Sequence, residues 1–586
     1  MKKTKIICTL GPATNTRDKM EALINAGMNV ARFNFSHGSH EEHLERFNAL
    51  KAAREATGKL NTAILLDTKG PEIRTNDMEN NGVELVRGNT IRISMTEVLG
   101  NAEKFSVTYA DLINDVAPGN HILLDDGLVD LLVTEIDHEN GEIVTKIENT
   151  GVLKSKKGVN VPNVSVNLPG ITEKDESDIR FGVQNGIDFI AASFVRRASD
   201  VMEIRAILEE EGDSKVKIIS KIENQEGVDN IEEILAVSDG IMVARGDLGV
   251  EIPTHEVPIV QKYIIKKCNE AGKPVVTATQ MLDSMQRNPR PTRAEAGDVA
   301  NAIFDGTDAV MLSGETAAGD FPVEAVTTMA DICVRTEAAL EGQDAFALKR
   351  YDQSDMTEAI GQAVGHTARN LGIEIIVAAT SSGHTAQMIS KYRPNATIVA
   401  ATFDEQTARR LSITWGVNAH VIERPASTDE MFDNASALVQ EKDYVSEGDL
   451  ILITAGVPVG ESGTTNLMKI QVIGTQLAKG EGVGNGHFIG KAVLAEDAET
   501  ANKNAVIGSV LVARTTDKDY APALEKVGAI ITEEGGITSH AAIMGIERGI
   551  PVIVSAKEAL DKIANGELIT VDARRGVIYR GATISI

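Results

Sequence analysis

The chain has few cysteines, a single tryptophan and no long apolar run in its 586 residues. Cys8, Cys268 and Cys333 show no CxxC spacing, which argues against a zinc site or a disulfide framework and indicates buried thiols in a reducing compartment. No stretch approaches the roughly 18 apolar residues of a membrane span. The apolar run near the start is too short for a signal peptide. We therefore expect a cytoplasmic protein with no membrane partner.

Basic residues are also scarce: 58 Lys and Arg face 85 Asp and Glu, a net charge of −27. A charge of this sign argues against nucleic acid as a partner. It also means that an anionic substrate needs locally placed Arg, Lys or bound cations.

The chain is too long for one hydrophobic core, and its length suggests about three to five domains. Its 42% hydrophobic and 24% charged residues are typical of a soluble globular protein.

Strand-like and helix-like segments alternate in the first part of the chain. The apolar strands begin near residues 5, 30, 63, 189, 217, 240, 274 and 309. Eight such strands predict a closed (β/α)₈ barrel over residues 1–70 and 169–340, with its site at the carboxyl ends of the strands. An open doubly wound sheet is the alternative.

Residues 71–168 interrupt this alternation with short β-like runs. The turn signals Asn81-Gly82, Asp126-Gly127 and Asn140-Gly141 separate the runs. We expect a small all-β domain inserted into the barrel.

Two further domains are expected after the barrel. A polar stretch at 341–355 is interpreted as a linker, and residues 341–474 then alternate helix and strand, as an open α/β domain does. The glycine-rich run KGEGVGNG at 479–486 is typical of a hinge. Residues 475–586 read as a fourth, β-rich domain.

The most informative stretch is residues 217–247, which reads as strand, helix and strand. Lys221 and Glu223 end the first strand, and Gly246 and Asp247 follow the second. Two carboxylates and an ammonium at neighbouring strand ends suit a divalent cation and a phosphorylated substrate. Solvated ion pairs at strand ends are the alternative, but the clustering of these residues disfavours it.

Other strand ends add to this set. Two basic residues suited to phosphate are Arg32 and Arg74. Asn34, Ser36, Asp67 and Thr68 supply oxygens and one carboxylate, which suit a monovalent cation. Phosphoryl transfer depends mainly on positioning and charge neutralisation, so these are the parts that it requires. The sequence has no P-loop and no kinase-type glycine-rich loop with HRD.

The chain closely resembles the pyruvate kinase family over about residues 1–474. The motifs that match are ARFNFSHG at 31–38, LDTKGPEIRT at 66–75, IISKIENQEGV at 218–228, IMVARGDLGVEIP at 241–253, ATQMLDSM at 278–285, PRPTRAEAGDVANA at 289–302 and MLSGETAAG at 311–319. The resemblance implies transfer of the phosphoryl group of phosphoenolpyruvate to ADP, giving pyruvate and ATP. It also implies dependence on Mg²⁺ (or Mn²⁺) and K⁺, a homotetramer, and activation by a sugar phosphate or AMP.

The resemblance assigns a role to each matching residue. Glu223 and Asp247 resemble the divalent-metal ligands, and Asn34, Ser36, Asp67 and Thr68 resemble the K⁺ ligands. Lys221, Thr279 and Arg32 match catalytic positions, with Lys221 on the moving phosphoryl group and Thr279 on the proton route. Arg32, Lys221, Gly246, Asp247 and Thr279 match substrate-binding positions. Arg74, Lys157, Asn34 and His37 match nucleotide-binding positions, and Glu72 matches the glutamate that accompanies K⁺ dependence.

The α/β domain carries a candidate anion cradle between a strand and a helix. Hydroxyls, a glycine and backbone N–H groups at a helix amino terminus suit a phosphate. A simple capped turn is the alternative. In the family the equivalent loop binds the effector phosphate, which here implicates Thr380, Ser381, Ser382, Gly383 and Thr385.

The last domain resembles the mobile phosphohistidine domain of phosphoenolpyruvate-utilising enzymes, through GGITSHAAIMGIERGIPVIV at 535–554. A histidine at the position of His540 carries phosphate in such domains, and Thr538 and Ser539 could contact it. A dikinase-like phosphoenolpyruvate synthase that uses His540 is therefore the alternative function. No ATP-grasp domain accompanies this segment, which favours a structural, assembly or regulatory role. A regulatory protein without turnover is disfavoured because Lys221, Glu223, Asp247 and Thr279 are all present.

Overall fold

The computed structural model describes residues 2–340, 356–456, 465–484 and 486–582. The expected linker at 341–355 lies outside the described residues. The chain forms two compact units. The first is Met1–Glu358 with Thr380–Arg393 and Thr402–Val421, and the second is Ala359–Ala379, Pro394–Ala401 and Ile422–Ile586.

The first unit contains a closed barrel of eight parallel strands, so the open-sheet alternative is wrong. Around the barrel the strands follow the order β1-β17-β16-β15-β14-β13-β3-β2. Their bounds are β1 (Lys5–Thr9), β2 (Val30–Asn34), β3 (Ala63–Asp67), β13 (Phe189–Ala192), β14 (Lys217–Ile222), β15 (Gly240–Ala244), β16 (Val275–Ala278) and β17 (Ala309–Leu312). Seven of the eight starts are those expected, and β16 begins one residue later than residue 274.

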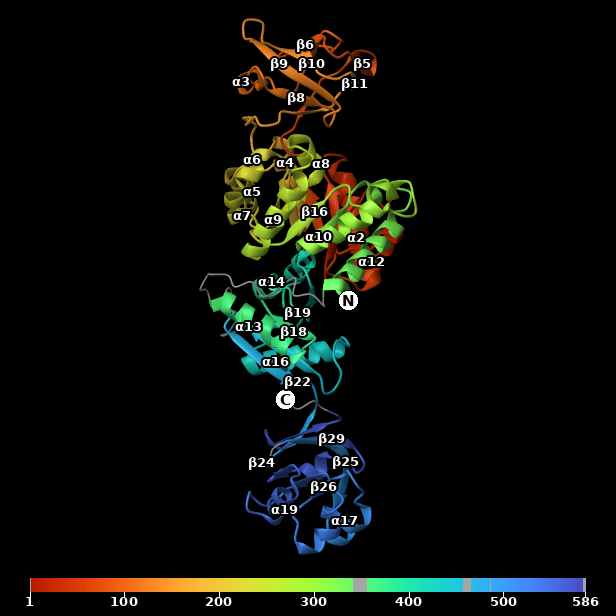
Figure 1. Ribbon diagram of the computed structural model, residues 1–586, viewed down its shortest axis with the longest axis vertical. Helices are drawn as coiled ribbons and strands as arrows, with labels where there is room; N and C mark the ends of the chain where they lie inside the picture. Colours follow the sequence, from red (N-terminus) through yellow and green to blue (C-terminus); the bar gives the residue numbers. More distant parts are fainter. Residues whose placement is uncertain (1, 341–355, 457–464, 485, 583–586) are drawn as a thin grey trace. The chain divides into compact units, whose positions relative to one another are not determined.

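Helices surround these strands, and α2, α9, α10 and α12 are labelled in this outer layer in Figure 1. The helices of this layer are α1 (Arg17–Ala26), α2 (His40–Thr57), α4 (Glu173–Gln184), α5 (Ala198–Glu210), α6 (Gln225–Asp229), α7 (Ile231–Val237), α8 (Arg245–Glu251), α9 (Val257–Ala271), α10 (Arg293–Asp305), α11 (Gly314–Ala317) and α12 (Pro322–Leu340). Local sequence fixes several of the helix ends. Ser39 and Thr172 form capping boxes with Glu42 and Asp175, which satisfy backbone N–H groups at the helix starts.

The barrel strands are short apolar runs because both of their faces are buried. Side chains such as Ile7, Leu65, Ile219 and Met242 fill the interior. Alternate residues, such as Ile6, Ile64 and Ile218, pack outward in the layer under the helices. The carboxyl ends of the strands are thereby held by a rigid core on both sides.

The insertion is a β-module with its own core, shown by β6, β8, β9 and β10 in Figure 1. Its sheet has the order β4-β12-β8-β9-β10-β6-β7, and β11 pairs with β5. The bounds are β4 (Ile73–Arg74), β5 (Gly82–Leu85), β6 (Thr90–Ser94), β7 (Lys104–Ser106), β8 (His121–Leu124), β9 (Val129–Asp137), β10 (Glu142–Ile147), β11 (Gly151–Lys154) and β12 (Gly158–Asn160). One short helix, α3 (Leu112–Asp115), departs from the expected all-β content.

The α/β segment alternates helix and strand as expected. Its elements are α13 (Met356–Leu371), β18 (Ile375–Ala379), α14 (His384–Lys391), β19 (Thr397–Thr402), α15 (Glu405–Arg410), β20 (Val417–Val421), α16 (Thr428–Glu441), β21 (Leu450–Ala455) and β22 (Leu467–Val472). β18 lies parallel to β19 and β21, and β22 is antiparallel to β21. Within the first unit, Arg393 pairs with Asp308 at 2.9 Å and Arg409 with Asp188 at 2.9 Å. These buried ion pairs attach α14 and α15 to the amino-terminal side of the barrel.

The last segment forms an eight-stranded sheet of order β23-β30-β29-β25-β26-β27-β28-β24. Its elements are β23 (Gln476–Lys479), β24 (Glu481–Val483), β25 (His487–Ala495), α17 (Ala498–Asn504), β26 (Val510–Ala513), α18 (Ala521–Leu524), β27 (Ala529–Thr532), α19 (His540–Arg548), β28 (Val552–Val554), α20 (Ala559–Lys562), β29 (Leu568–Asp572) and β30 (Val577–Arg580).

Residues 479–483 of the glycine-rich run belong to β-sheet structure, not to the hinge that their composition predicts. β24, within this run, is antiparallel to β28. A Cβ on Gly482 would lie 1.7 Å from the carbonyl oxygen of Ala573, and one on Gly480 would lie 2.2 Å from that of Val554. The glycines therefore allow close backbone packing inside a sheet rather than chain flexibility.

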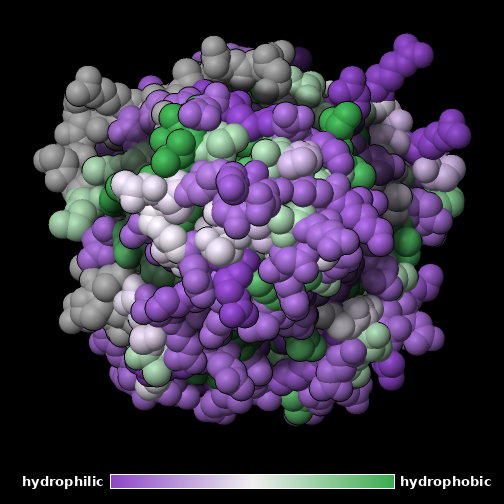
Figure 2. Space-filling view, turned by 90° about the horizontal axis from the view of Figure 1, so that it is seen from below, coloured by the Kyte–Doolittle hydropathy of each residue, from purple (hydrophilic) through white to green (hydrophobic). Residues whose placement is uncertain are grey.

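The three cysteines are buried and free, as expected. Among the described helices, none combines the length and apolar character needed to cross a membrane. The face in Figure 2 is mostly hydrophilic with scattered apolar spots, in keeping with the acidic composition.

We predict that Gly482→Ala destabilises the last domain, because the methyl group overlaps a backbone carbonyl that cannot move freely. The cost of such overpacking is about 1–3 kcal/mol or more. Calorimetry and limited proteolysis of the full chain should show earlier unfolding of residues 475–582. Gly536→Ala is the matched control, because a Cβ there meets nothing within 4 Å. Identical transitions for the two variants would contradict this account.

Candidate active site

Charged side chains from three barrel strands meet at the carboxyl ends of these strands. Arg32 lies in β2, Asp67 is the last residue of β3, and Lys221 lies one residue before the end of β14. β2 and β3 are paired so that Asn34 is opposite Asp67, which places both residues at the same rim. This is the end of a (β/α)₈ barrel that carries catalytic groups.

The Lys221 ammonium is held at the centre of this cluster. Its Nζ lies 3.2 Å from Asp67 Oδ1, 3.1 Å from Glu223 Oε1 and 2.8 Å from Ser193 Oγ. Arg32 Nε donates to Asp67 Oδ2 at 2.6 Å, and Arg32 Nη1 donates to Thr9 Oγ1 at 2.8 Å. The two cations therefore share one carboxylate, which fixes their positions with respect to each other.

Burial and charge both act on the ionisation of this cluster. Burial alone would raise the pKa of Asp67, but Arg32 and Lys221 bring it below its ordinary value. Burial likewise opposes the charge on Lys221, yet Asp67 and Glu223 raise the Lys221 pKa above its ordinary value. The raised pKa favours the charged form of Lys221, and its electric field is strong because the ammonium is buried.

Glu223 and Asp247 form an acidic pair beside Lys221. Burial raises the pKa of Glu223 to about 7, with Lys221 opposing and the Asp247 carboxylate adding to the rise. Burial also raises the pKa of Asp247. Two neighbouring carboxylates whose pKa values are raised by burial fit a divalent cation, which would favour the charged form of both. Within the described ranges no group of three or more His, Cys, Asp or Glu is arranged to hold a metal. Mg²⁺ commonly uses one or two carboxylates with substrate oxygens and water, so the pair is sufficient.

Gly246 and Thr279 also come together at this rim. The Gly246 N–H donates to Thr279 Oγ1 at 2.8 Å, and Thr279 Oγ1 donates to the Ala278 carbonyl at 2.7 Å. Gly246 and Asp247 follow β15 as expected, and they belong to the first turn of α8. Thr279 and Gln280 have φ of 68° and 54°, a left-handed backbone that side chains rarely adopt.

The inserted β-module contributes a second set of charges. Arg74 donates two hydrogen bonds to Glu72, from Nε at 2.7 Å and Nη2 at 2.8 Å. Burial would raise the pKa of Glu72, but the bonds from Arg74 lower it overall. Lys157 Nζ pairs with Asp125 at 2.9 Å inside the same module.

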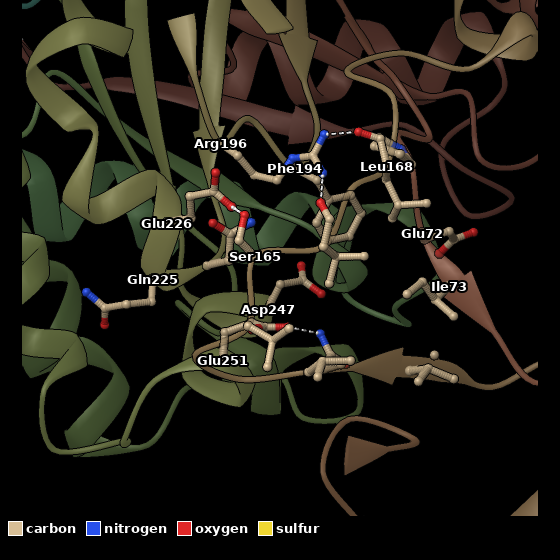
Figure 3. Close-up of a pocket in the computed structure, with 18 of the residues that line it drawn as sticks. Glu72, Ile73, Ser165, Leu168, Phe194, Arg196, Gln225, Glu226, Asp247 and Glu251 are labelled. Atoms are coloured by element: carbon tan, nitrogen blue, oxygen red, sulfur yellow. Dashed lines mark hydrogen bonds between the residues drawn. The ribbon is translucent and has the colours of Figure 1, made fainter. Parts of the chain in front are cut away.

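A cavity of about 600 Å³ lies between this module and the barrel rim. Figure 3 shows Asp247 and Glu72 among the side chains that line it. Asn160 of the module donates to Glu251 of α8 at 2.7 Å, and Arg196 Nη1 donates to the Val166 carbonyl at 2.8 Å. These bonds connect the module and its return segment to the barrel. The cavity takes in Arg74 and Asp247 but stops short of Lys221.

The residues matched to K⁺ lie together at the ends of β2 and β3. Asn34 Oδ1 accepts from the Ser36 N–H at 3.0 Å, and Thr68 Oγ1 accepts from the Ser193 N–H at 3.0 Å. Asp67 provides the carboxylate of this group but is already paired with Arg32 and Lys221. His37 is exposed, and its carbonyl accepts from His43.

The remaining candidate residues belong to the loop before α14 and to the last segment of the chain. Thr380 Oγ1 accepts from the Gly383 N–H at 2.9 Å, which closes the loop before α14, and Gly383 has a φ of 90°. Thr385 is buried in the first turn of α14, whereas Ser382 is exposed. His540 begins α19, where its Nδ1 lies 3.0 Å from Thr516 Oγ1.

Three residues of the site were not singled out by sequence reasoning. Ser193 bonds Lys221 through its hydroxyl, and the Phe194 N–H donates to Glu223 Oε2 at 2.6 Å. Arg245 Nη1 pairs with Asp298 at 2.8 Å, and its Nη2 donates to the Thr279 carbonyl at 2.7 Å. Their positions directly after β13 and β15 were the available signal, because strand-end residues of a barrel share one rim.

Comparisons with known proteins agree with this geometry. The family model described as pyruvate kinase, barrel domain, matches residues 1–326, and pyruvate kinase, alpha/beta domain, matches residues 358–471. The model described as PEP-utilising enzyme, mobile domain, matches residues 507–576.

Relatives over the full chain carry a single name. A pyruvate kinase of Geobacillus stearothermophilus is 60% identical over 581 residues, and one of Lactobacillus delbrueckii subsp. bulgaricus is 57% identical over 585 residues, each covering 99% of both chains. A crystal structure of a pyruvate kinase from Cryptosporidium parvum has a TM-score of 0.77 and 42% identity, and covers 80% of this chain and 96% of that one. The closed barrel, its buried Lys221 cluster and these matches lead to one conclusion: the chain belongs to the pyruvate kinase family.

Proposed function

We propose that the chain transfers the phosphoryl group of phosphoenolpyruvate to ADP at the carboxyl rim of the barrel, giving pyruvate and ATP. The observation that carries this proposal is the buried Lys221 ammonium, held by Asp67, Ser193 and Glu223 beside Arg32. A fixed cation in a dry site stabilises the charge that spreads over a phosphoryl group in transit. The full-length relatives named pyruvate kinase support this reading over a dikinase.

In this proposal each part of the rim has its own task. Glu223 and Asp247 would hold Mg²⁺ (or Mn²⁺), which when bound neutralises phosphate charge. Asn34, Ser36, Asp67 and Thr68 would hold K⁺, with Glu72 as the residue that accompanies this dependence.

Lys221 and Arg32 bind the phosphoryl oxygens. The backbone of Gly246 and Asp247 and the Thr279 hydroxyl bind the substrate carboxylate, for which the Gly246 N–H and the Thr279 hydroxyl would exchange their present bonds to Thr279 Oγ1 and the Ala278 carbonyl. Thr279 lies on the route by which the enolate carbon gains its proton. This protonation makes the transfer strongly favourable overall.

The nucleotide is proposed to lie against Arg74, Lys157, Asn34 and His37. Lys157 is paired with Asp125, so ADP phosphates would compete with that carboxylate for the ammonium. Arg74 is held by Glu72 and keeps Nη1 on the Lys156 carbonyl at 2.8 Å. Binding of the nucleotide therefore exchanges contacts within the β-module for contacts across the cavity.

We further propose that the loop of Thr380, Ser381, Ser382, Gly383 and Thr385 binds the phosphate of an activating sugar phosphate or AMP. The left-handed Gly383 and the start of α14 support this role, because backbone N–H groups converge at a helix amino terminus.

A homotetramer in the cytoplasm is proposed from the family alone. For the last domain we propose a structural, assembly or regulatory role rather than phosphotransfer through His540.

Lys221→Ala should lower kcat by about 10³-fold while KM for phosphoenolpyruvate changes only a few-fold, because the ammonium acts mainly on the transition state. The measurement is pyruvate formation coupled to lactate dehydrogenase, with Mg²⁺ and with or without K⁺. Lys266→Ala, an exposed lysine of α9, is the matched control. Near-normal turnover of Lys221→Ala would refute the assignment. Formation of AMP from ATP and pyruvate by the unchanged chain would support the synthase alternative instead.

Ser193→Ala should lower kcat by about tenfold, because Lys221 loses the hydroxyl that orients its ammonium. Ser193 is a positioning residue, so KM for phosphoenolpyruvate should stay within about twofold of the unchanged chain. Ser220→Ala is the matched control, since Ser220 precedes Lys221 but bonds Ser238 at 2.6 Å. Equal losses in the two variants would indicate a general effect on β14 and not on Lys221.

Ser382→Glu should abolish activation by phosphorylated effectors, since a carboxylate at the loop repels phosphate. Steady-state kinetics with ribose 5-phosphate, glucose 6-phosphate and AMP measure the activation, and basal kcat should be kept. If every effector that activates the unchanged chain still activates this variant, the loop is misassigned.

A further inference from the structure

A second cavity, of about 480 Å³, lies at the opposite end of the barrel from the active site. It is bounded by the amino-terminal ends of barrel strands, with Lys217 at the start of β14 and Pro274 just before β16. Helices α14 and α15 contribute Met388 and Arg410. All of these residues belong to the first compact unit.

Four basic side chains line this cavity: Arg205, Lys217, Lys273 and Arg410. The single acidic residue among the described lining residues is Asp239. Such an excess of positive charge is unexpected in a chain whose net charge is −27. A local field of this sign in an acidic protein concentrates anions.

Asp239 does not neutralise these cations. Its carboxylate is divided among Arg205 Nη2 at 2.8 Å, Lys217 Nζ at 3.0 Å and the Ile218 N–H at 2.9 Å. The single negative charge of Asp239 is therefore shared by Arg205 and Lys217, and the carboxylate also accepts a backbone hydrogen bond.

The other two cations are held mainly by neutral acceptors. Lys273 Nζ donates to the carbonyl oxygens of Leu235 at 2.6 Å and Ser238 at 2.7 Å. Arg410 donates to the Lys215 carbonyl at 2.7 Å and to Thr407 Oγ1 at 2.6 Å, and Asp404 lies 3.6 Å away, outside the cavity lining. The bonds to neutral acceptors orient both side chains, and Asp404 partly offsets the charge of Arg410.

Burial and neighbouring charges both act on the ionisation of these groups. Burial lowers the pKa of Lys273, and Arg205 and Lys217 lower it further against the influence of Asp239. Burial also lowers the pKa of Arg410, although Asp404 and three further carboxylates act in the opposite direction. An anion between these side chains would relieve both effects.

The remaining walls define the class of anion. Met202, Met388 and Leu411 are apolar, whereas Ser382, His384 and Thr407 bring polar groups. Met202 is 50% exposed, which is high for a large apolar side chain. Cavities of about 300–1,000 Å³ take small metabolites, and a phosphate with an apolar-faced ring would match both kinds of wall.

We propose that this cavity binds a phosphate monoester, with its phosphate among Lys217, Arg205 and Arg410 and its body against Met388. The site is distinct from the proposed effector loop, because its charge comes from the barrel side and from α15. Ser382 is the one residue of that loop that borders both sites. A ligand here bridges the start of β14 and helices α14 and α15, and β14 carries Lys221 four residues further on.

The test measures binding of three probes to the full-length protein: inorganic phosphate, ribose 5-phosphate and AMP. Isothermal titration gives affinity and stoichiometry, and hydrogen exchange reports protection at residues 217–219 and 271–274. We expect protection by at least one ester probe in the unchanged chain. Inorganic phosphate competing with that probe would show that the phosphate group is the part recognised.

Lys217→Gln should weaken binding of that probe at this site by about tenfold, the loss of one charge-assisted hydrogen bond. Arg205 remains on Asp239 in this variant, so the base of β14 keeps its main ion pair. Gln387→Glu is the second variant, because Gln387 lines the cavity from α14 and its replacement adds a negative charge. Lys266→Gln, which is exposed on α9 and outside the cavity, is the matched control and should bind as the unchanged chain does.

Ser381→Glu distinguishes binding in the cavity from binding at the effector loop, since Ser381 does not line the cavity. It should abolish loop-dependent activation but leave the protection at 217–219. If no probe protects 217–219 and 271–274, or if Lys217→Gln and Gln387→Glu both bind every probe within twofold of the control, the proposal is wrong. Loss of protection at 217–219 in Ser381→Glu alone would assign the ligand to the loop and also overturn it.

Discussion

The structure depends most on one constraint: a lysine ammonium must stay charged while it is buried at the rim of the barrel. Burial lowers the pKa of Lys221, and Asp67 and Glu223, which lie within 3.2 Å of its ammonium, raise it above its ordinary value. Asp67 in turn holds Arg32, so one carboxylate sets the spacing of both cations. Burial of the apolar side chains on both faces of the strands offsets the unfavourable desolvation free energy of these charges. In return, the site presents a fixed positive field to a phosphoryl group without needing to reorganise.

At the opposite end of the barrel, one arrangement of aspartate, arginine and backbone N–H occurs three times. Asp188, Asp239 and Asp308 precede β13, β15 and β17, and each accepts a backbone N–H from a neighbouring strand. An arginine pairs with each of them: Arg409, Arg205 and Arg393 respectively. Two of these arginines, Arg409 and Arg393, belong to the segments around α14 and α15. The aspartates that attach these segments to the barrel are therefore the same ones that bond the backbone of its strands. β14 joins the two ends, because Lys217 starts it beside the basic cavity and Lys221 lies near the catalytic end.

Much of the fold and of the active site could be predicted from the order of residues in the sequence. The strands were readable because parallel barrel strands are short apolar runs, and polar residues after them had to share a rim. Lys221, Glu223, Asp67 and Arg32 were found in this way. Ser193 and Phe194 were not singled out, because a hydroxyl or a backbone N–H after a strand has no chemical signature until it faces a charged partner. The glycines at 480 and 482 were misread for a similar reason: glycine permits either flexibility or close packing, and only the neighbouring backbone shows which one applies.

The sequence by itself determined the barrel, the β-module, the chemistry of the rim and the likeness to the pyruvate kinase family. Each of these depends on local patterns of apolar, charged and turn residues, which the chain displays in order. Only the tertiary structure decided the partners: Lys221 with Ser193, Lys157 with Asp125, and both Arg205 and Lys217 with Asp239. These pairings join residues far apart in the chain, and their energies depend on distance and burial. Both quantities exist only once the chain has folded.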